Sequence, residues 1–105
     1  MAQRTINMNI VEIVKKYIDE ISQKYEIEAV YLFGSYAKGT NHEDSDIDVA
    51  IILKSDANTF QLMVDMMMLT QTVDLRIEPH PIKKEDFESG NPFVDEIKST
   101  GLKVA

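Results

Sequence analysis

The chain has 105 residues, which suits one domain with a single modest core, so residues 1–105 are predicted to form one unit. Apolar residues make up 44% and charged residues 28%, a balance typical of a folded chain rather than a disordered one. The net charge of −7 disfavours long nucleic acids as partners, and the absence of cysteine excludes disulfides, thiolate metal sites and thiol catalysis.

The first predicted element is an amphipathic helix over residues 9–24, where apolar side chains recur at helical spacing with charged ones largely opposite. Those charged residues interrupt any apolar run of the kind that a signal peptide or a membrane span requires. We therefore expect a cytoplasmic protein that does not enter the membrane. A short apolar run over residues 28–33, which stops at Gly34, then predicts a buried strand.

Four further segments follow the first strand. Residues 35–38 predict a short helix, residues 40–45 are polar and predict a loop, and residues 46–53 predict a second buried strand. Residues 58–70 predict a long helix, in which the methionines at 66–68 spread around the circumference. Two interpretations of that run stay open: contact with another protein chain, because methionine suits adaptable binding surfaces, or a helix buried on two sides.

The remaining third of the chain predicts a third strand, a last helix and a short terminal strand. Strict alternation over residues 73–78 predicts a third strand, which Pro79 ends. Residues 81–90 have loop composition with one helical turn near their middle, residues 92–100 predict a helix that begins at a proline, and residues 102–104 fit a short strand. The order α-β-α-β-α-β-α predicts an α/β (α+β) fold, with helices packed on a small mixed sheet.

The dipeptide Gly34-Ser35 lies where the first strand gives way to a helix, and it predicts a phosphate-binding turn. Glycine lets the backbone approach a ligand closely, and free N–H groups together with the Ser35 hydroxyl form an anion site. An ordinary strand-to-helix turn would have the same sequence. A P-loop is rejected, because it needs lysine and then serine or threonine after its second glycine, whereas here Lys38 precedes Gly39.

Acidic residues in the second and third strands are the candidate metal ligands. Asp46 and Asp48 are two residues apart on a strand and project to the same face, and their like charges favour a shared Mg²⁺ ion. Asp74 in the next predicted strand could join them in a site able to hold two metal ions. In the alternative, Asp74 lies on the solvent face with Arg76 and Glu78. Glu78 is the second candidate for the third acid.

Residues 34–40 (Gly-Ser-Tyr-Ala-Lys-Gly-Thr) and 45–51 (Ser-Asp-Ile-Asp-Val-Ala-Ile) together resemble the signature of the polymerase-beta nucleotidyltransferase superfamily. The short chain is similar to the minimal nucleotidyltransferases, which lack the helical domain of their larger relatives. Many of those proteins are antitoxins paired with a HEPN-domain ribonuclease toxin. The resemblance implies that they neutralise the toxin by transferring AMP from ATP to one of its tyrosines.

The resemblance also implies roles for individual residues. Gly34 and Ser35 would hold the triphosphate of ATP, Asp46 and Asp48 would bind two Mg²⁺ ions, and Asp74 would complete the site and help to activate the attacking hydroxyl. We therefore expect a metal-dependent nucleotidyltransferase that acts on a HEPN-type partner, within a homo- or hetero-oligomer. Two alternatives remain open: an antitoxin that blocks its partner by contact alone, and an enzyme that modifies a small molecule such as an antibiotic hydroxyl.

Overall fold

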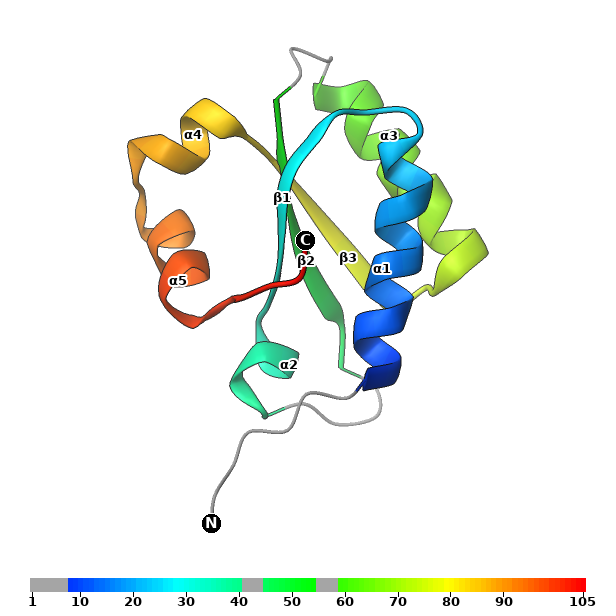
Figure 1. The fold of residues 1–105 in the computed structure, drawn as a ribbon, viewed down its shortest axis with the longest axis horizontal. Coiled ribbons are helices and arrows are strands. Elements are labelled where there is room, and N and C mark those ends of the chain that lie inside the picture. The colour runs from blue at the N-terminus through cyan, green and yellow to red at the C-terminus, as the bar shows by residue number, and fades with distance from the viewer. Residues whose placement is uncertain (1–7, 41–44, 55–58) are drawn as a thin grey trace.

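A four-stranded mixed sheet organises the computed structural model, which describes residues 8–40, 45–54 and 59–105 (Figure 1). The strands are β1 (Ile27–Phe33), β2 (Ile47–Leu53), β3 (Ile77–Lys83) and β4 (Leu102–Lys103). They lie in the order β3-β2-β1-β4, and β1 pairs antiparallel with both β2 and β4, whereas β2 and β3 are parallel. The predicted α/β fold with a mixed sheet is confirmed.

Helices cover both faces of this sheet. They are α1 (Met8–Ser22), α2 (Ser35–Lys38), α3 (Thr59–Val73), α4 (Lys84–Ser89) and α5 (Pro92–Thr100). Helices α1 and α3 pack on one face and α4 and α5 on the other, while the short α2 follows the end of β1 (Figure 1). In the described ranges, no helix has both the length and the apolar character needed to cross a lipid bilayer.

The larger core lies between the sheet and helices α1 and α3. Every second residue of β2 points into this core, and the residues between them point to the other face of the sheet, as strand geometry requires. Tyr17 of α1 is fully buried there, and its hydroxyl donates a hydrogen bond to the backbone carbonyl of Met66 in α3 at 2.5 Å. Burial strongly raises the pKa of the Tyr17 phenol, so this group remains a neutral donor that joins the two helices.

The second face of the sheet has a smaller core, and it also carries the acidic residues of interest. Ala50 and Ile52 of β2 pack there against Ile97 of α5. Asp48 has the same parity in β2 as these two residues, so its side chain projects to this face at the beginning of the strand. The candidate site therefore lies at one end of the α4/α5 face of the sheet.

The third strand differs from its prediction. Helix α3 continues to Val73, and a turn over residues 74–76, closed by a hydrogen bond of 3.2 Å from the Ile77 N–H to the Asp74 carbonyl, precedes β3. The prediction that Pro79 ends the strand was wrong, because β3 lies at the edge of the sheet and a proline there need not donate to a neighbouring strand. The predicted loop at residues 40–45 and the predicted helix start at residue 58 fall partly outside the described residues.

Candidate active site

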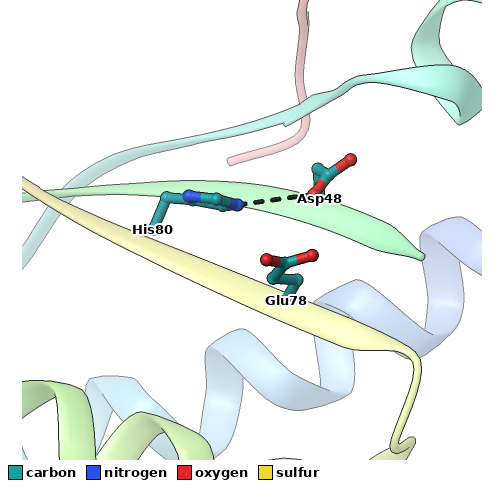
Figure 2. A group of neighbouring side chains, drawn as sticks. All are labelled: Asp48, Glu78 and His80. Atoms are coloured by element: carbon teal, nitrogen blue, oxygen red, sulfur yellow. Dashed lines mark hydrogen bonds and ion pairs between the residues drawn. The ribbon is translucent and has the colours of Figure 1, made fainter.

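The pairing of three strands brings the acidic residues together. Asp48 of β2 lies opposite Phe33 of β1 and, on its other side, opposite Glu78 of β3. Two residues further along β3, His80 projects to the same face as Glu78. One side-chain oxygen of Asp48, one of Glu78 and one ring nitrogen of His80 all lie within 4.8 Å of one another (Figure 2). This spacing is short enough for the three groups to contact one cation.

His80 packs against aromatic rings that hold it beside Asp48. Its Nε2 atom lies 3.4 Å from Oδ1 of Asp48. Its ring meets that of Phe33 edge-on, with centroids 5.0 Å apart, and lies 5.9 Å from that of Phe93 at the start of α5. The sequence prediction missed His80 because the third strand was ended at Pro79. The sequence does contain a signal for His80: it lies two residues after Glu78, and a strand that continues through Pro79 places both side chains on the same face.

The local electrostatics show that negative charge is crowded at this point. Desolvation raises the pKa of the Glu78 carboxyl, and the nearby charges of Asp48 and Asp46 raise it further. Asp46 is exposed, immediately precedes β2, and lies outside the group of three whose ligand atoms are mutually close. A divalent cation would relieve this repulsion, and carboxylate oxygens are the protein ligands that Mg²⁺ prefers. The two carboxylates of the cluster therefore fit a divalent cation such as magnesium.

The predicted phosphate turn lies directly against Asp48. Gly34 ends β1 with φ +75° and ψ −151°, a conformation that L-residues with a side chain rarely adopt. A Cβ atom at this position would also collide with Oδ2 of Asp48. The backbone conformation favours glycine, and any other residue would have to displace the Asp48 carboxylate. Helix α2 begins at the next residue, the half-buried Ser35. The turn and the acidic residues are therefore parts of one site.

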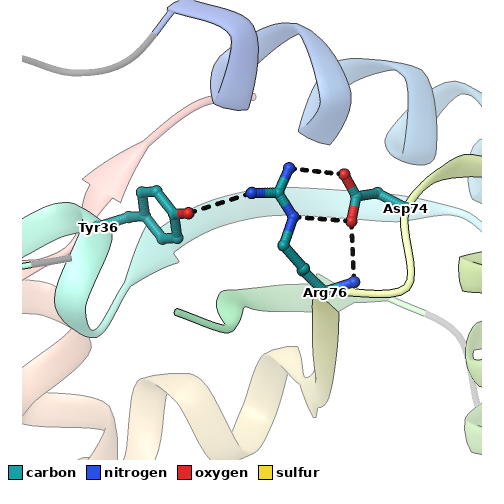
Figure 3. Close-up of polar contacts among 3 residues, drawn as sticks. All are labelled: Tyr36, Asp74 and Arg76. Carbon is teal, nitrogen blue, oxygen red and sulfur yellow. Dashed lines mark hydrogen bonds and ion pairs between the residues drawn. The ribbon is translucent and has the colours of Figure 1, made fainter. Parts of the chain in front are cut away.

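Asp74, the third acid suggested by the sequence, is not brought to this cluster. It lies in the turn before β3, where its carboxylate accepts hydrogen bonds from Nη2 of Arg76 at 2.8 Å, from Nε at 3.1 Å and from the backbone N–H at 2.9 Å (Figure 3). The side-chain hydrogen bond from Arg76 lowers the pKa of Asp74. Arg76 also donates through Nη1 to the hydroxyl of the buried Tyr36 at 3.4 Å. The structure thus places Glu78, rather than Asp74, beside Asp48.

Comparison with known proteins agrees with this geometry. Residues 15–99 match the sequence model of the family described as polymerase beta, nucleotidyltransferase. The chain is 33% identical to the relative named Putative protein adenylyltransferase MJ0141 of Methanocaldococcus jannaschii, over 92% of this chain and 100% of that protein.

Solved structures show the same fold. A crystal structure of a toxin-antitoxin with AMP-PNP has a TM-score of 0.66 at 20% identity and covers 90% of this chain and 72% of the other. A tri-AMPylated HEPN toxin of Shewanella oneidensis in complex with an MNT antitoxin gives a TM-score of 0.59 at 16% identity, covering 93% and 71%. The sequence match over most of the chain, on a fold shared with these structures, shows that the protein belongs to the polymerase beta nucleotidyltransferase family.

Proposed function

We propose that this nucleotidyltransferase transfers AMP from ATP to a hydroxyl group, a tyrosine of a HEPN-type partner protein, and so acts as an antitoxin. The observation that carries the proposal is the contact between the Gly34 backbone and the Asp48 carboxylate, which joins a phosphate-binding turn to a metal-binding cluster. The names of the relatives support the acceptor class, since one is named Putative protein adenylyltransferase MJ0141 and another was solved as an MNT antitoxin with an AMPylated HEPN toxin.

The nucleotide is oriented by the turn at the end of β1. Residue 34 has no side chain, so phosphate oxygens can approach the main chain around Gly34 and the adjacent Ser35 hydroxyl closely. From there the phosphate chain extends towards Asp48, because that carboxylate borders the turn. This orientation places the α-phosphate, rather than the base, beside the acidic residues.

Asp48 and Glu78 are the residues of the cluster that would hold magnesium, with the exposed Asp46 beside Glu78. His80, which lies on the same strand as Glu78, fixes the Asp48 carboxylate. Bound Mg²⁺ would neutralise charge on the triphosphate and on the departing pyrophosphate. We assign the role of third acid to Glu78 instead of Asp74, since the oxygens of Asp74 are engaged by Arg76.

The transfer requires one bond to form and one to break. The acceptor oxygen attacks the α-phosphorus, and the bond from that phosphorus to the oxygen bridging to the β-phosphate breaks, releasing pyrophosphate. The proton of the attacking hydroxyl passes to a carboxylate of the cluster, for which Glu78 has the best access because its side chain is exposed on the edge strand. Positioning and charge neutralisation supply most of the rate acceleration.

The test is to incubate the protein with ATP labelled at the α-phosphate, Mg²⁺ and the product of the neighbouring gene, and to locate the added AMP by mass spectrometry. Glu78→Gln and Asp48→Asn should each reduce transfer by about 100-fold or more, as expected when one charged group of a phosphoryl-transfer site is removed. Asp74→Asn is the matched control, because it also removes one carboxylate charge near β3 and should leave transfer within about threefold of the native rate.

The outcomes separate the alternatives. If no AMP is transferred and Asp48→Asn still neutralises the partner, the protein blocks by contact and the enzymatic proposal is wrong. If Asp74→Asn abolishes transfer while Glu78→Gln does not, the assignment of the third acid is reversed. Chelation of divalent cations by EDTA should stop the reaction, and added Mg²⁺ should restore it.

A further inference from the structure

Helix α3 and the turn that follows it present a mainly apolar surface, which we call the α3 face and which is lined by Phe60, Met63, Val64, Met67, Met68, Thr70, Gln71 and Leu75. These eight residues line a shallow hollow of about 400 Å³. Phe60 is 78% exposed and Leu75 77%, and four more of the apolar members are between 39% and 58% exposed. Met66 is fully buried against α1 and the sheet, so only part of the methionine run belongs to this surface.

The exposed apolar area of this surface lies in the upper half of the range for the largest apolar patch on an isolated folded chain. At about 150 Å² for each fully exposed large apolar side chain, the exposed fractions of the six apolar residues amount to roughly 500 Å². Patches of that size on monomers commonly mark an interaction site. Two such patches together bury about 1,000 Å², the area at which a specific interface becomes plausible before neighbouring residues are counted.

The charge of the molecule favours a second copy of this chain as the occupant. In a two-fold symmetric interface the same surface is contributed twice, so a carboxylate near the axis would meet its own copy. With a net charge of −7, two copies of the chain repel each other, and a surface without acidic groups is where that repulsion is smallest. None of the eight residues of the α3 face is charged. A basic partner, by contrast, would be recognised through carboxylates, which this face does not offer.

The helix also has the residue spacing that pairing with itself requires. Phe60, Val64, Met67 and Gln71 recur at intervals of four, three and four residues and form one seam along the exposed side of α3. Val64 and Met67 lie at the middle of this seam. A two-fold axis at this point brings Met67 of one copy close to Met67 of the other, with an offset along the helices of about 4–5 Å in an antiparallel pair.

We propose that the α3 face is a homodimer interface, with Val64 and Met67 at its centre. Helix α3 packs on the face of the sheet opposite to Asp48 and Glu78, so the dimer leaves both candidate active sites open. The proposal therefore rests on no part of the assigned enzymatic function. It would hold equally for a chain that is inactive.

The absence of cysteine allows a direct test by cross-linking. A Met67→Cys variant treated with a mild oxidant should form a disulfide-linked dimer at least about tenfold faster than a Ser99→Cys control, because a specific interface raises the effective thiol concentration. Ser99 is exposed on α5, on the other side of the molecule. Sedimentation velocity of the native chain from about 1 to 100 µM should give a mass of twice 12.0 kDa at the upper concentrations.

A charged residue introduced on the α3 face provides a second test of the dimer. Met67→Glu should be monomeric over the same concentrations, whereas Ser99→Glu, which adds the same charge elsewhere, should dimerise like the native chain. A native chain that stays monomeric while Met67→Cys and Ser99→Cys cross-link at equal rates would overturn the proposal. A dimer that persists in Met67→Glu would also overturn it. Loss of a HEPN partner from Met67→Glu, with a native chain that is monomeric alone, would assign the face to that partner instead.

Discussion

Replacing Gly34 by alanine tests the central feature of the site, the contact between the phosphate turn and Asp48. The added methyl group faces two obstacles: a backbone with φ +75° and the Oδ2 atom of Asp48, which lies well inside contact distance of the new Cβ. The first obstacle costs about 1–3 kcal/mol of folding stability. The second forces the Asp48 carboxylate out of its present position beside Glu78 and His80. Displacement of a reacting group by about 1 Å can lower a rate 100-fold, equivalent to about 2.7 kcal/mol of activation free energy.

Gly90→Ala is the matched control for the strain in the backbone. Gly90 has φ +76°, and the nearest side-chain atom to its new Cβ would be Oδ1 of Asp95 at 3.9 Å, an ordinary contact. Both variants should therefore lose about 1–3 kcal/mol in urea denaturation, since both force alanine into positive φ. Only Gly34→Ala should lose AMP transfer, by about 100-fold, measured with labelled ATP. Equal transfer rates in the two variants would refute the argument that Gly34 makes room for Asp48.

Three further predictions concern stability. Tyr17→Phe removes the hydrogen bond to the Met66 carbonyl and should cost about 1 kcal/mol in urea denaturation, without changing AMP transfer. Glu78→Gln should stabilise the metal-free protein at pH values above 4.5, the ordinary pKa of glutamate. The pKa of Glu78 is raised, so ionisation of this carboxyl is unfavourable in the folded state and glutamine avoids that cost. The gain in stability should vanish at lower pH, and thermal denaturation at a series of pH values measures it. Asp74→Asn should destabilise the folded protein at neutral pH, because the hydrogen bond from Arg76 lowers the pKa of Asp74 and favours its ionised form. Stability from such a carboxylate is lost in acid, so the difference in stability between the variant and the native chain should disappear as pH falls below about 3.8.

The sequence was sufficient to predict most of the fold, because hydrophobic periodicity is strong in α1, β1, β2 and α5. It failed where two signals conflicted between residues 70 and 83. Alternation over residues 73–78 has the pattern of a strand, yet the helix continues to Val73 and the chain then turns at Asp74. The two prolines of β3 have the pattern of a loop, yet an edge strand accommodates them. Edge position is a property of the assembled sheet and cannot be read from a local window.

The sequence was sufficient to predict the glycine turn and the first acidic residues of the candidate site, but not its third acid. Gly34 and Asp48 could be paired from the sequence, since each lies at the end of a well-defined strand. The third acid could not be chosen, because the choice between Asp74 and Glu78 depends on where β3 begins and on which face each residue occupies. The structure adds one more fact that composition cannot supply, namely that Arg76 binds the carboxylate of Asp74.

The topology explains why these residues meet at one end of the sheet. β1 runs antiparallel to β2, so the end of β1 lies beside the beginning of β2, and the parallel crossover through α3 returns the chain to begin β3 at the same end. Parity then decides which side chains join the site. Ile77 is buried in the core shared with α1 and α3, so Glu78 must project to the opposite face, where Asp48 lies. A shift of β3 by one residue would exchange the two faces and remove Glu78 from the site. The turn at residues 74–76, which fixes the start of β3 through the hydrogen bond from the Ile47 N–H to the Arg76 carbonyl at 2.8 Å, therefore sets the chemistry of the site without contacting it.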